Sequence, residues 1–347
     1  MIKKQNIFFD NLLDFNVTAG GIIENDTEIL NLFFYDHCES NSLCLIGDCL
    51  EWKPKIWIEF EQEKIEKLKE INIVSLLGDL TALQSYCINL FPDIKINYYA
   101  YNLGLQITPI RDTLSRRTVL PIHKNRRDRV LHTSIGTIRL NRYILLKFLL
   151  KYNFDVFHPS IPYNISKDFE YQISQCLVTS RDVPTEIKER RVFENNVTAN
   201  EFNIKQIEIL SESYINVVTT FPNTDMLKYC HDEKYFDTIL TKTVPIMLCE
   251  KNSNTNMSES LLGFLPYAGF NLKSDSDDNP VLRWTSLLED NKHIFQDKER
   301  VKELYDTNQR VIEHNYNRLV YTDWESERLV QFNRLPIFIK EHLGWLK

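Results

Sequence analysis

The feature that most constrains this chain is a charged helix start that leads directly into an apolar strand, in residues 231–248. The segment opens with acidic and basic side chains and keeps a helical pattern as far as residues 242–243. It then becomes the apolar run Val-Pro-Ile-Met-Leu at 244–248. A short helix followed at once by a buried strand is a unit of an α/β sheet. Such sheets bind ligands at strand ends and helix N-termini, where backbone N–H groups point outward.

Glu233 and Lys234 lie at that helix start, and each suits a different part of a nucleotide. A glutamate carboxylate can accept hydrogen bonds from both ribose hydroxyls, and a lysine ammonium can pair with a phosphate. The alternative is an amphipathic helix whose charged first turn is solvated.

Composition limits the class of protein. The chain has 347 residues, 43% of them hydrophobic and 26% charged, with a net charge of −7, which is typical of a globular protein with room for two domains. The negative charge gives no general indication of nucleic-acid binding. Only nine glycines occur, and neither G-x-G-x-x-G nor G-x-x-x-x-G-K-[ST] is present, which disfavours dinucleotide-binding Rossmann enzymes and P-loop nucleotidases.

The sequence shows little sign of a targeting segment or of disulfide bonds. No run approaches ~20 apolar residues, and the first residues do not have the pattern of a signal peptide. Seven scattered cysteines include no Cys-x-x-Cys pair, so free thiols are expected rather than disulfides or zinc. We therefore expect a cytoplasmic protein without a membrane segment.

Strand-like and helix-like runs alternate along the chain, which predicts open, mostly parallel sheets. In the first third we expect strands at 7–9, 43–46, 56–60, 71–77 and 94–99, and helices at 27–35, 63–70 and 80–91. In the second half we expect strands at 129–134, 154–157, 214–221 and 244–248, and helices at 139–150, 231–242 and 298–311. The amphipathic tail at 323–347 is broken at Pro336.

Two arginines, Arg139 and Arg142, lie one helical turn apart at the start of the predicted helix 139–150. Two guanidiniums in this position can bind a diphosphate bidentately. Exposed arginines on a surface helix are the alternative.

Residues 111–129 are strongly basic, with seven arginines and lysines against two aspartates. The cations are Arg111, Arg116, Arg117, Lys124, Arg126, Arg127 and Arg129. A solvated loop and a surface that faces a polyanion are both consistent with this composition.

The segment at 231–248 resembles the donor-binding signature of GT-B glycosyltransferases, the group that includes fucosyltransferases and related bacterial, phage and large-virus enzymes. That signature is roughly T-E-K-x-[FW]-x-x-[IL]-x-x-[GK]-x-[VP]-P-[IVF]. Its matching residues here are Glu233, Lys234, Phe236, Pro245 and Ile246, with Asp232 in place of the threonine.

Two further segments resemble the same enzymes. Gly136, Arg139 and Arg142 match the family's N-G-x-x-R-x-x-R, which follows a strand that here contains His132. Thr219 and Thr220 correspond to the family's strand end V-V-T-E-T, although its acidic residue is missing.

The resemblance implies an α/β fold with two Rossmann-like domains facing a cleft and a C-terminal helix that crosses back to the first domain. The expected boundaries are 1–110 for an acceptor-side domain, 111–128 for a basic inter-domain segment, 129–322 for a nucleotide-sugar-binding domain and 323–347 for a helical tail. The donor site would comprise His132, Gly136, Arg139, Arg142, Thr219, Thr220, Asp232, Glu233 and Lys234.

The implied activity is transfer of a hexose or pentose from a nucleoside-diphosphate sugar to an acceptor hydroxyl, without a metal or other cofactor and with inversion. The acceptor is expected to be a glycan or a hydroxymethylated base in phage-type DNA. Asp48 and Asp79, which follow predicted strands, are the candidates for the general base, with a helix N-cap or turn role as the alternative for each.

Other interpretations remain. A non-catalytic binding protein on the same fold would explain the departures at Asp232 and Thr220, and a plain nucleotide-binding or nucleic-acid-interaction module is a further option. The acidic sequence at 275–278 contains the D-x-D pattern of manganese-dependent glycosyltransferases, but its position favours a solvated acidic loop.

Overall fold

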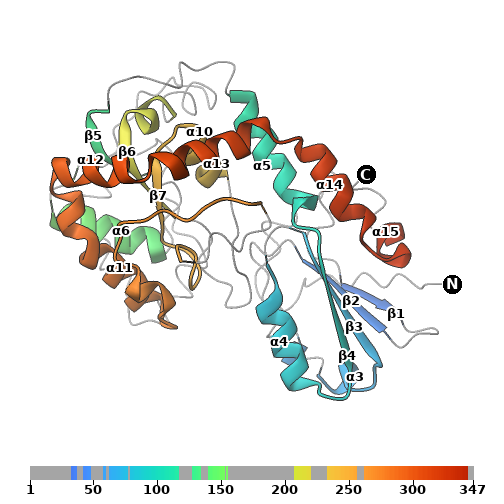
Figure 1. Cartoon of the computed structure of the whole chain (residues 1–347). Helices are drawn as coiled ribbons and strands as arrows, with labels where there is room; N and C mark the ends of the chain where they lie inside the picture. The colour runs from blue at the N-terminus through green and yellow to red at the C-terminus, as the bar shows by residue number, and fades with distance from the viewer. Residues whose placement is uncertain are drawn as a thin grey trace, which may run out of the picture. The chain divides into compact units, whose positions relative to one another are not determined.

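The computed structural model describes residues 33–36, 42–47, 58–59, 62–76, 79–116, 127–133, 140–152, 154, 207–219, 233–255 and 262–342. Contacts divide these residues into two compact units. The first contains the described residues up to Pro109 and from Asp323 onward, and the second contains those from Ile110 to Thr322. Each unit has parallel strands and helices, so the predicted α/β class is confirmed (Figure 1).

A four-stranded sheet in the order β1-β2-β3-β4 forms the centre of the first unit. Its strands are β1 (Phe33–Asp36), β2 (Ser42–Gly47), β3 (Glu70–Ser75) and β4 (Lys95–Ala100). β1 runs antiparallel to β2, whereas β2, β3 and β4 run parallel to one another. The helices before the chain enters the second unit are α3 (Gln62–Ile65), α4 (Thr81–Leu90) and the first half of α5 (Leu103–Arg116).

Two elements predicted for this unit are wrong. Residues 33–35, expected in a helix at 27–35, belong to β1 and pair with β2. Ile58 and Glu59, expected in a strand at 56–60, are helical. Ile58 is nonetheless fully buried. A short apolar run indicates burial but does not distinguish a buried strand from a buried helix.

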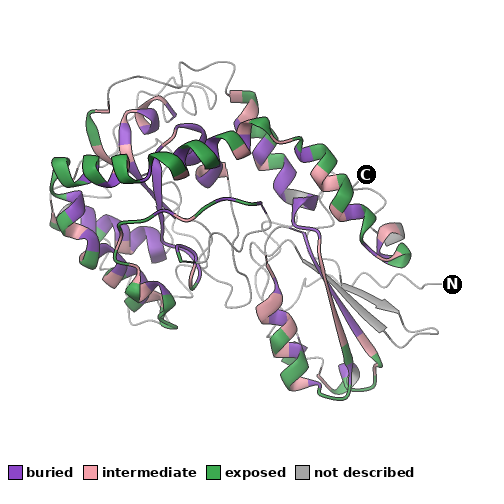
Figure 2. Cartoon of the chain, in the orientation of Figure 1, coloured by how far each residue is buried: buried purple, intermediate pink, exposed green. Residues whose placement is uncertain are grey.

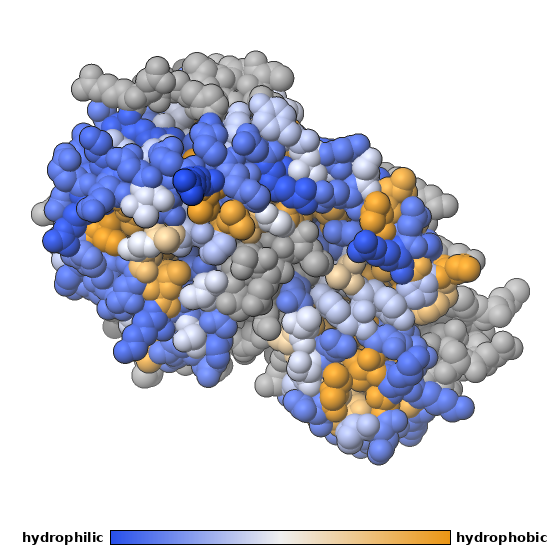
Figure 3. Space-filling view, viewed as in Figure 1, coloured by the Kyte–Doolittle hydropathy of each residue, from blue (hydrophilic) through white to orange (hydrophobic). Residues whose placement is uncertain are grey.

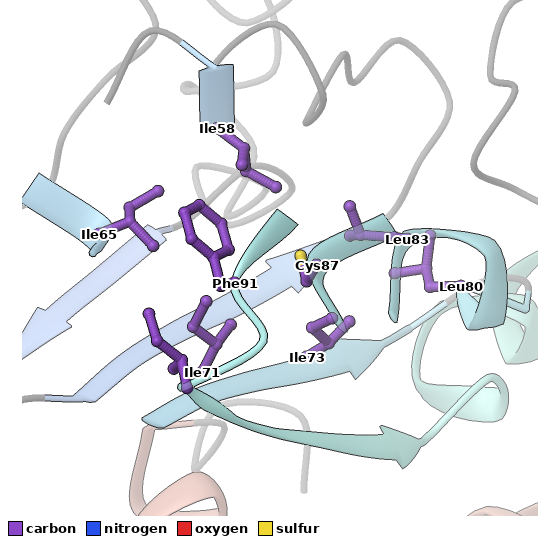
Figure 4. Close-up of a cluster of buried hydrophobic side chains, with 9 residues drawn as sticks. Ile58, Ile65, Ile71, Ile73, Leu80, Leu83, Cys87 and Phe91 are labelled. Carbon is purple, nitrogen blue, oxygen red and sulfur yellow. The ribbon is translucent and has the colours of Figure 1, made fainter. Parts of the chain in front are cut away.

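The core of the first unit lies between its sheet and α4. Nine apolar side chains form it: Ile58, Ile65, Ile71, Ile73, Leu80, Leu83, Cys87, Phe91 and Ile94. Figure 4 shows this cluster, with all but Ile94 labelled. Leu83 and Cys87 are one turn apart on α4, which is the spacing that places side chains on one helix face. The predicted helix at 80–91 is therefore confirmed, and the structure shows which of its faces is buried.

The end of the chain packs on the first unit through α14 (Trp324–Asn333) and α15 (Ile337–His342). Phe332, Leu335 and Ile339 form an apolar cluster with side chains from the end of β3 and from Tyr101. Gln331 accepts a hydrogen bond of 3.1 Å from the Leu103 backbone N–H, which satisfies a free donor at the start of α5. Apolar side chains also lie on the outer surface of both helices (Figure 3), where Ile337 is 74% exposed.

The second unit is built on a three-stranded parallel sheet in the order β5-β6-β7. The strands are β5 (Arg129–Thr133), β6 (Ser213–Val218) and β7 (Val244–Met247). Figure 2 shows that β6 and β7 are buried over nearly their whole length. Pro245 lies on β7, which pairs only with β6 among the described strands, as expected for a residue that cannot donate to a ladder.

The described part of the second unit contains six further helical elements besides the end of α5 and the helical residues 207–211. They are α6 (Leu140–Lys151), α10 (Glu233–Leu240), the 3-10 helix η4 (Lys273–Ser276), α11 (Pro280–Phe295), α12 (Lys298–Thr307) and α13 (Gln309–Tyr321). α6 packs beside α11, and α10 packs against β6, β7 and α13. The helix expected at 298–311 is two helices that meet at Asn308. No helix in the described ranges is both long and apolar enough to cross a membrane.

Arg127 lies at the amino-terminal end of the second sheet and binds backbone carbonyl groups there. Its guanidinium donates to the carbonyl oxygens of Ser211, Thr241 and Lys242, at 3.1, 2.7 and 3.0 Å, and also to the Ser213 carbonyl. Carbonyls at the ends of helical segments lack intrahelical partners, and one planar guanidinium with five donors can satisfy several of them. This residue of the basic stretch therefore binds the protein's own backbone.

Three buried asparagines bind the backbone of residues 262–272. These residues are part of the connection between β7 and α11 and do not form a strand. Each amide accepts from the backbone N–H and donates to the C=O of one residue, as a neighbouring strand would. The pairs, with distances between 2.7 and 2.9 Å, are Asn315 with Leu265, Asn308 with Ala268, and Asn291 with Asn271. All three asparagines on the helices are at most 1% exposed.

Replacing one of these amides should destabilise the second unit. We expect Asn315→Ala to lower the free energy of unfolding by about 1–3 kcal/mol, because it removes both partners of the Leu265 backbone. Urea denaturation followed by circular dichroism measures the change. Asn317→Ala is the matched control on the exposed face of α13, with an expected change within about 0.5 kcal/mol. Equal effects at the two positions would contradict this role of Asn315.

Candidate functional site

Six of the predicted site residues lie in the described part of the chain: Asp79, His132, Arg142, Thr219, Glu233 and Lys234. The others lie outside it: Asp48, Gly136, Arg139, Thr220 and Asp232. All the described donor-site candidates belong to the second unit, whereas Asp79 belongs to the first.

The first turn of α6 forms hydrogen bonds with residues at the carboxyl ends of two strands of the second sheet. Arg142 Nε–H donates to Thr219 Oγ1 at 3.1 Å, and its Nη2 donates to the Thr219 carbonyl at 3.4 Å. The neighbouring Asn141 amide donates to the Leu248 carbonyl at 2.8 Å, just after β7. Two adjacent residues of one helix thus fix the ends of two strands.

Arg142 is not the exposed surface arginine that was the alternative to a diphosphate clamp. It is only 7% exposed, and its guanidinium is directed at Thr219. The sequence therefore identified a residue at the strand ends, but its described hydrogen bonds stabilise the edge. Direct contact between Arg142 and a diphosphate stays a prediction.

Glu233 and Lys234 form the first turn of α10, as the charge pattern predicts. Lys234 Nζ lies 2.7 Å from Glu233 Oε1, and the two side chains are 28% and 47% exposed. Burial raises the pKa of the Glu233 carboxyl, but the charges of Lys234 and Arg116 outweigh this and hold the pKa below its usual range. A carboxylate and an ammonium are therefore both charged and partly accessible at this helix start.

Topology places the start of α10 at the same edge as the strand ends. Because β6 and β7 are parallel, the helix that joins them returns antiparallel to the sheet and begins near the carboxyl end of β6. The Asn216 amide of β6 donates to Thr238 Oγ1 on α10 at 2.6 Å, which fixes the helix on the sheet. Glu233 thus starts the helix that this contact anchors.

Asp237 forms a polar cluster with α5 that the sequence did not reveal. Thr113 Oγ1 donates to Asp237 Oδ1 at 3.1 Å, and Arg116 donates to Asp237 Oδ2 at 2.6 Å. Burial raises the pKa of Asp237 to about 6, although the charge of Arg116 and the hydroxyl of Thr113 lower it. Asp237 lies one turn after Glu233, so the cluster connects α5 to the helix that carries the candidate donor pair.

His132 is buried on β5 at 3% exposure. Burial, and to a smaller extent the charge of Arg129, lower its pKa to about 3. The imidazole is therefore neutral at physiological pH. It pairs in register with Asn216, whose side chain contacts α10, so it lies on the face of the sheet that α10 covers. A neutral histidine there cannot supply positive charge to a diphosphate.

Asp79 is engaged in the first unit by groups at the start of α4. Oδ1 accepts from the Thr81 backbone N–H at 2.8 Å and from the Tyr98 hydroxyl at 3.2 Å. Oδ2 accepts from Thr81 Oγ1 at 3.0 Å. The N-cap of α4 is Leu80, so Asp79 precedes the cap, and its bond to the Thr81 N–H corresponds to the turn role given as the alternative.

Three of the four described cations of the basic stretch bind protein groups. Arg116 pairs with Asp237 at 2.6 Å, and Arg129 lies 3.7 Å from Glu212. Arg127 binds backbone carbonyls. These contacts account for three of the seven positive charges within the fold, while residues 117–126 lie outside the described ranges.

Residues 276–278 of the acidic loop are exposed, as predicted for a solvated loop, but Asp275 is buried. Asp275 is 1% exposed and accepts hydrogen bonds from the backbone N–H groups of Asn254 and Thr255 at 2.9 and 3.0 Å. Asp277 accepts from the Asn279 N–H, and Asp278 pairs with a lysine. The loop therefore holds the segment after β7. Within the described ranges, no three His, Cys, Asp or Glu side chains are arranged to hold a metal ion.

Comparison with known proteins gives no family assignment. No protein-family model matches the chain, and a search of curated proteins finds no significant match.

The shifted pKa of Asp237 predicts a pH dependence of stability. Its pKa is about 6 in the folded state against about 3.9 unfolded, so the folded state binds more protons between these values. Its stabilising contribution is present below about pH 4 and is lost as pH rises through 6, by about 3 kcal/mol in total. Relative to Asp237→Asn, the wild type should therefore lose stability from pH 4 to 7.

The measurement is urea denaturation of both proteins across this range. Asp290→Asn, at an exposed position on α11, controls for the loss of one negative charge. A constant difference between wild type and Asp237→Asn would show that Asp237 does not titrate in this window.

Proposed function

We propose that this protein is a glycosyltransferase that binds a nucleoside-diphosphate sugar at the carboxyl edge of the β5-β6-β7 sheet. The observation that carries the proposal is the charged, partly accessible Glu233–Lys234 pair at the start of α10, beside strand ends fixed by Arg142. Parallel α/β sheets bind ligands at this edge. The resemblance of residues 231–248 to a donor-binding signature supports the same assignment.

In this proposal the ion pair between Glu233 and Lys234 breaks when the donor binds. The Glu233 carboxylate then accepts hydrogen bonds from the ribose hydroxyls, and the Lys234 ammonium pairs with a phosphate oxygen. The N-terminal dipole of α10 adds to the stabilisation of the diphosphate as it leaves. The proposed chemistry is inverting and needs no metal, because cationic side chains carry the charge of the leaving group.

The proposal includes a GT-B fold, in which one α/β domain binds the donor and the other the acceptor. The presence of a parallel sheet in each unit, and the packing of α14 and α15 on the first unit, support it. Of the two acceptors, a glycan is favoured over modified DNA because three of the four described arginines of the basic stretch, Arg116, Arg127 and Arg129, bind protein groups. A steeply salt-dependent affinity for duplex DNA would instead favour the DNA acceptor.

A non-catalytic binding protein is the second candidate, and the engagement of Asp79 favours it. Both oxygens of this general-base candidate already accept hydrogen bonds from Thr81. The glycosyltransferase should turn over the sugar nucleotide that it binds, whereas the binding protein should not. If Asp79 is the base, Asp79→Asn should abolish transfer while the affinity for the donor stays unchanged. Binding without any transfer or hydrolysis would favour the second candidate.

Lys234→Met should remove the binding of nucleoside diphosphates while preserving the fold. We expect UDP, GDP or CDP to raise the melting temperature of the wild type, because a ligand bound only to the folded state stabilises it by about 2.7 kcal/mol at a hundred times Kd. In Lys234→Met this shift should fall strongly, since the methionine keeps the stem of the side chain but not its charge. Differential scanning fluorimetry over a concentration series measures the effect.

Lys242→Met is the matched control. Lys242 lies beyond the opposite end of α10 and pairs with Glu313 at 2.6 Å, much as Lys234 pairs with Glu233. Its replacement should leave the nucleotide shift unchanged. Arg142 is less suitable for the test, because its removal also leaves Thr219 without its partner. Absence of a shift with every nucleotide in the wild type would refute the proposal.

A further inference from the structure

Thr133 carries a buried hydroxyl that has no hydrogen-bond partner among the described residues. The residue is the last of β5 and is 3% exposed. Burying a hydroxyl without a partner costs free energy, and native proteins pair the large majority of such groups. The buried hydroxyl therefore lowers the stability of the ligand-free protein.

The position of Thr133 is the one where a ligand of this sheet would bind. It pairs in register with Val217 of β6, two residues before Thr219, whose hydroxyl accepts from Arg142. Thr133 thus belongs to the carboxyl edge that α6 ties together. Successive side chains of a strand alternate between faces, so Thr133 faces away from the side on which Asn216 contacts α10.

We propose that the Thr133 hydroxyl is a binding residue of the donor site and donates a hydrogen bond to a diphosphate oxygen. This inference rests on the proposed function and adds a contact that the sequence motifs did not contain. A hydroxyl donor gains a short, strong hydrogen bond from a charged phosphate oxygen. The ligand supplies the acceptor that the free protein lacks, which explains why a polar side chain is present at this buried position.

A single isosteric variant tests the proposal, because the free and the bound protein should respond in opposite directions. Thr133→Val keeps the shape of the side chain and removes the hydroxyl. Without ligand, its melting temperature should equal that of the wild type or exceed it by about 2–4 °C. Its Kd for the nucleoside diphosphate that binds the wild type should rise about 10-fold to 100-fold. Thr133→Ser, which keeps the hydroxyl, should bind within about threefold of the wild type.

Thr243→Val is the matched control at the opposite end of the same sheet. Thr243 is fully buried, donates to the Leu210 carbonyl at 3.0 Å and accepts from Arg127 at 3.2 Å. Losing these bonds should lower the melting temperature and leave the Kd unchanged. The two threonine-to-valine changes should therefore have effects of opposite kind on stability and on binding.

The probes are UDP, GDP and CDP on the full chain, with inorganic pyrophosphate as a diphosphate without a nucleoside. A comparable loss of affinity for pyrophosphate supports the contact with phosphate, whereas a loss confined to nucleotides overturns it. A Thr133→Val protein that binds like the wild type, or that loses as much stability as Thr243→Val, also overturns the inference but leaves the proposed function intact. A wild type that binds none of the probes refutes the proposed function and this inference together.

Discussion

The second unit depends on one constraint, which is that every buried backbone N–H and C=O needs a partner. Its described sheet has only three strands, too few to pair the segments that surround it. Side chains supply the missing partners. Arg127 binds the carbonyls at the ends of two helical segments, and asparagine amides pair with an extended segment that has no neighbouring strand. The specificity of this unit therefore comes from a few polar side chains as much as from its apolar core.

This arrangement gives the two ends of the sheet different chemistry. At the amino-terminal end, the partly buried Arg127 guanidinium and the fully buried Thr243 hydroxyl both bond to groups of the protein itself. At the carboxyl end lie the charged pair that begins α10 and the unpartnered hydroxyl of Thr133. Unused hydrogen-bonding capacity is costly inside a protein, and it is retained where something other than the protein provides the partner.

Local patterns predicted the elements that carry the candidate site, but not the contacts between them. The helix start at Glu233 and the strand at 244–247 follow from charge and apolar periodicity within about 15 residues. Asp237 could not be assigned in this way, because its partners Thr113 and Arg116 lie more than a hundred residues away in sequence. The same limit applies to Arg142. Its hydrogen-bond partner Thr219 is 77 residues away, so the contact could not be read from the local pattern.

The asparagine pairs also determine an order of assembly. Their partners lie 20, 40 and 50 residues apart in sequence, and the pairs are nested: Asn271 with Asn291, then Ala268 with Asn308, then Leu265 with Asn315. Closing the shortest loop first reduces the entropy lost in closing the next one. As the chain leaves the ribosome, the extended segment can therefore dock stepwise from residue 271 back to residue 265, each step waiting for the next helix to emerge.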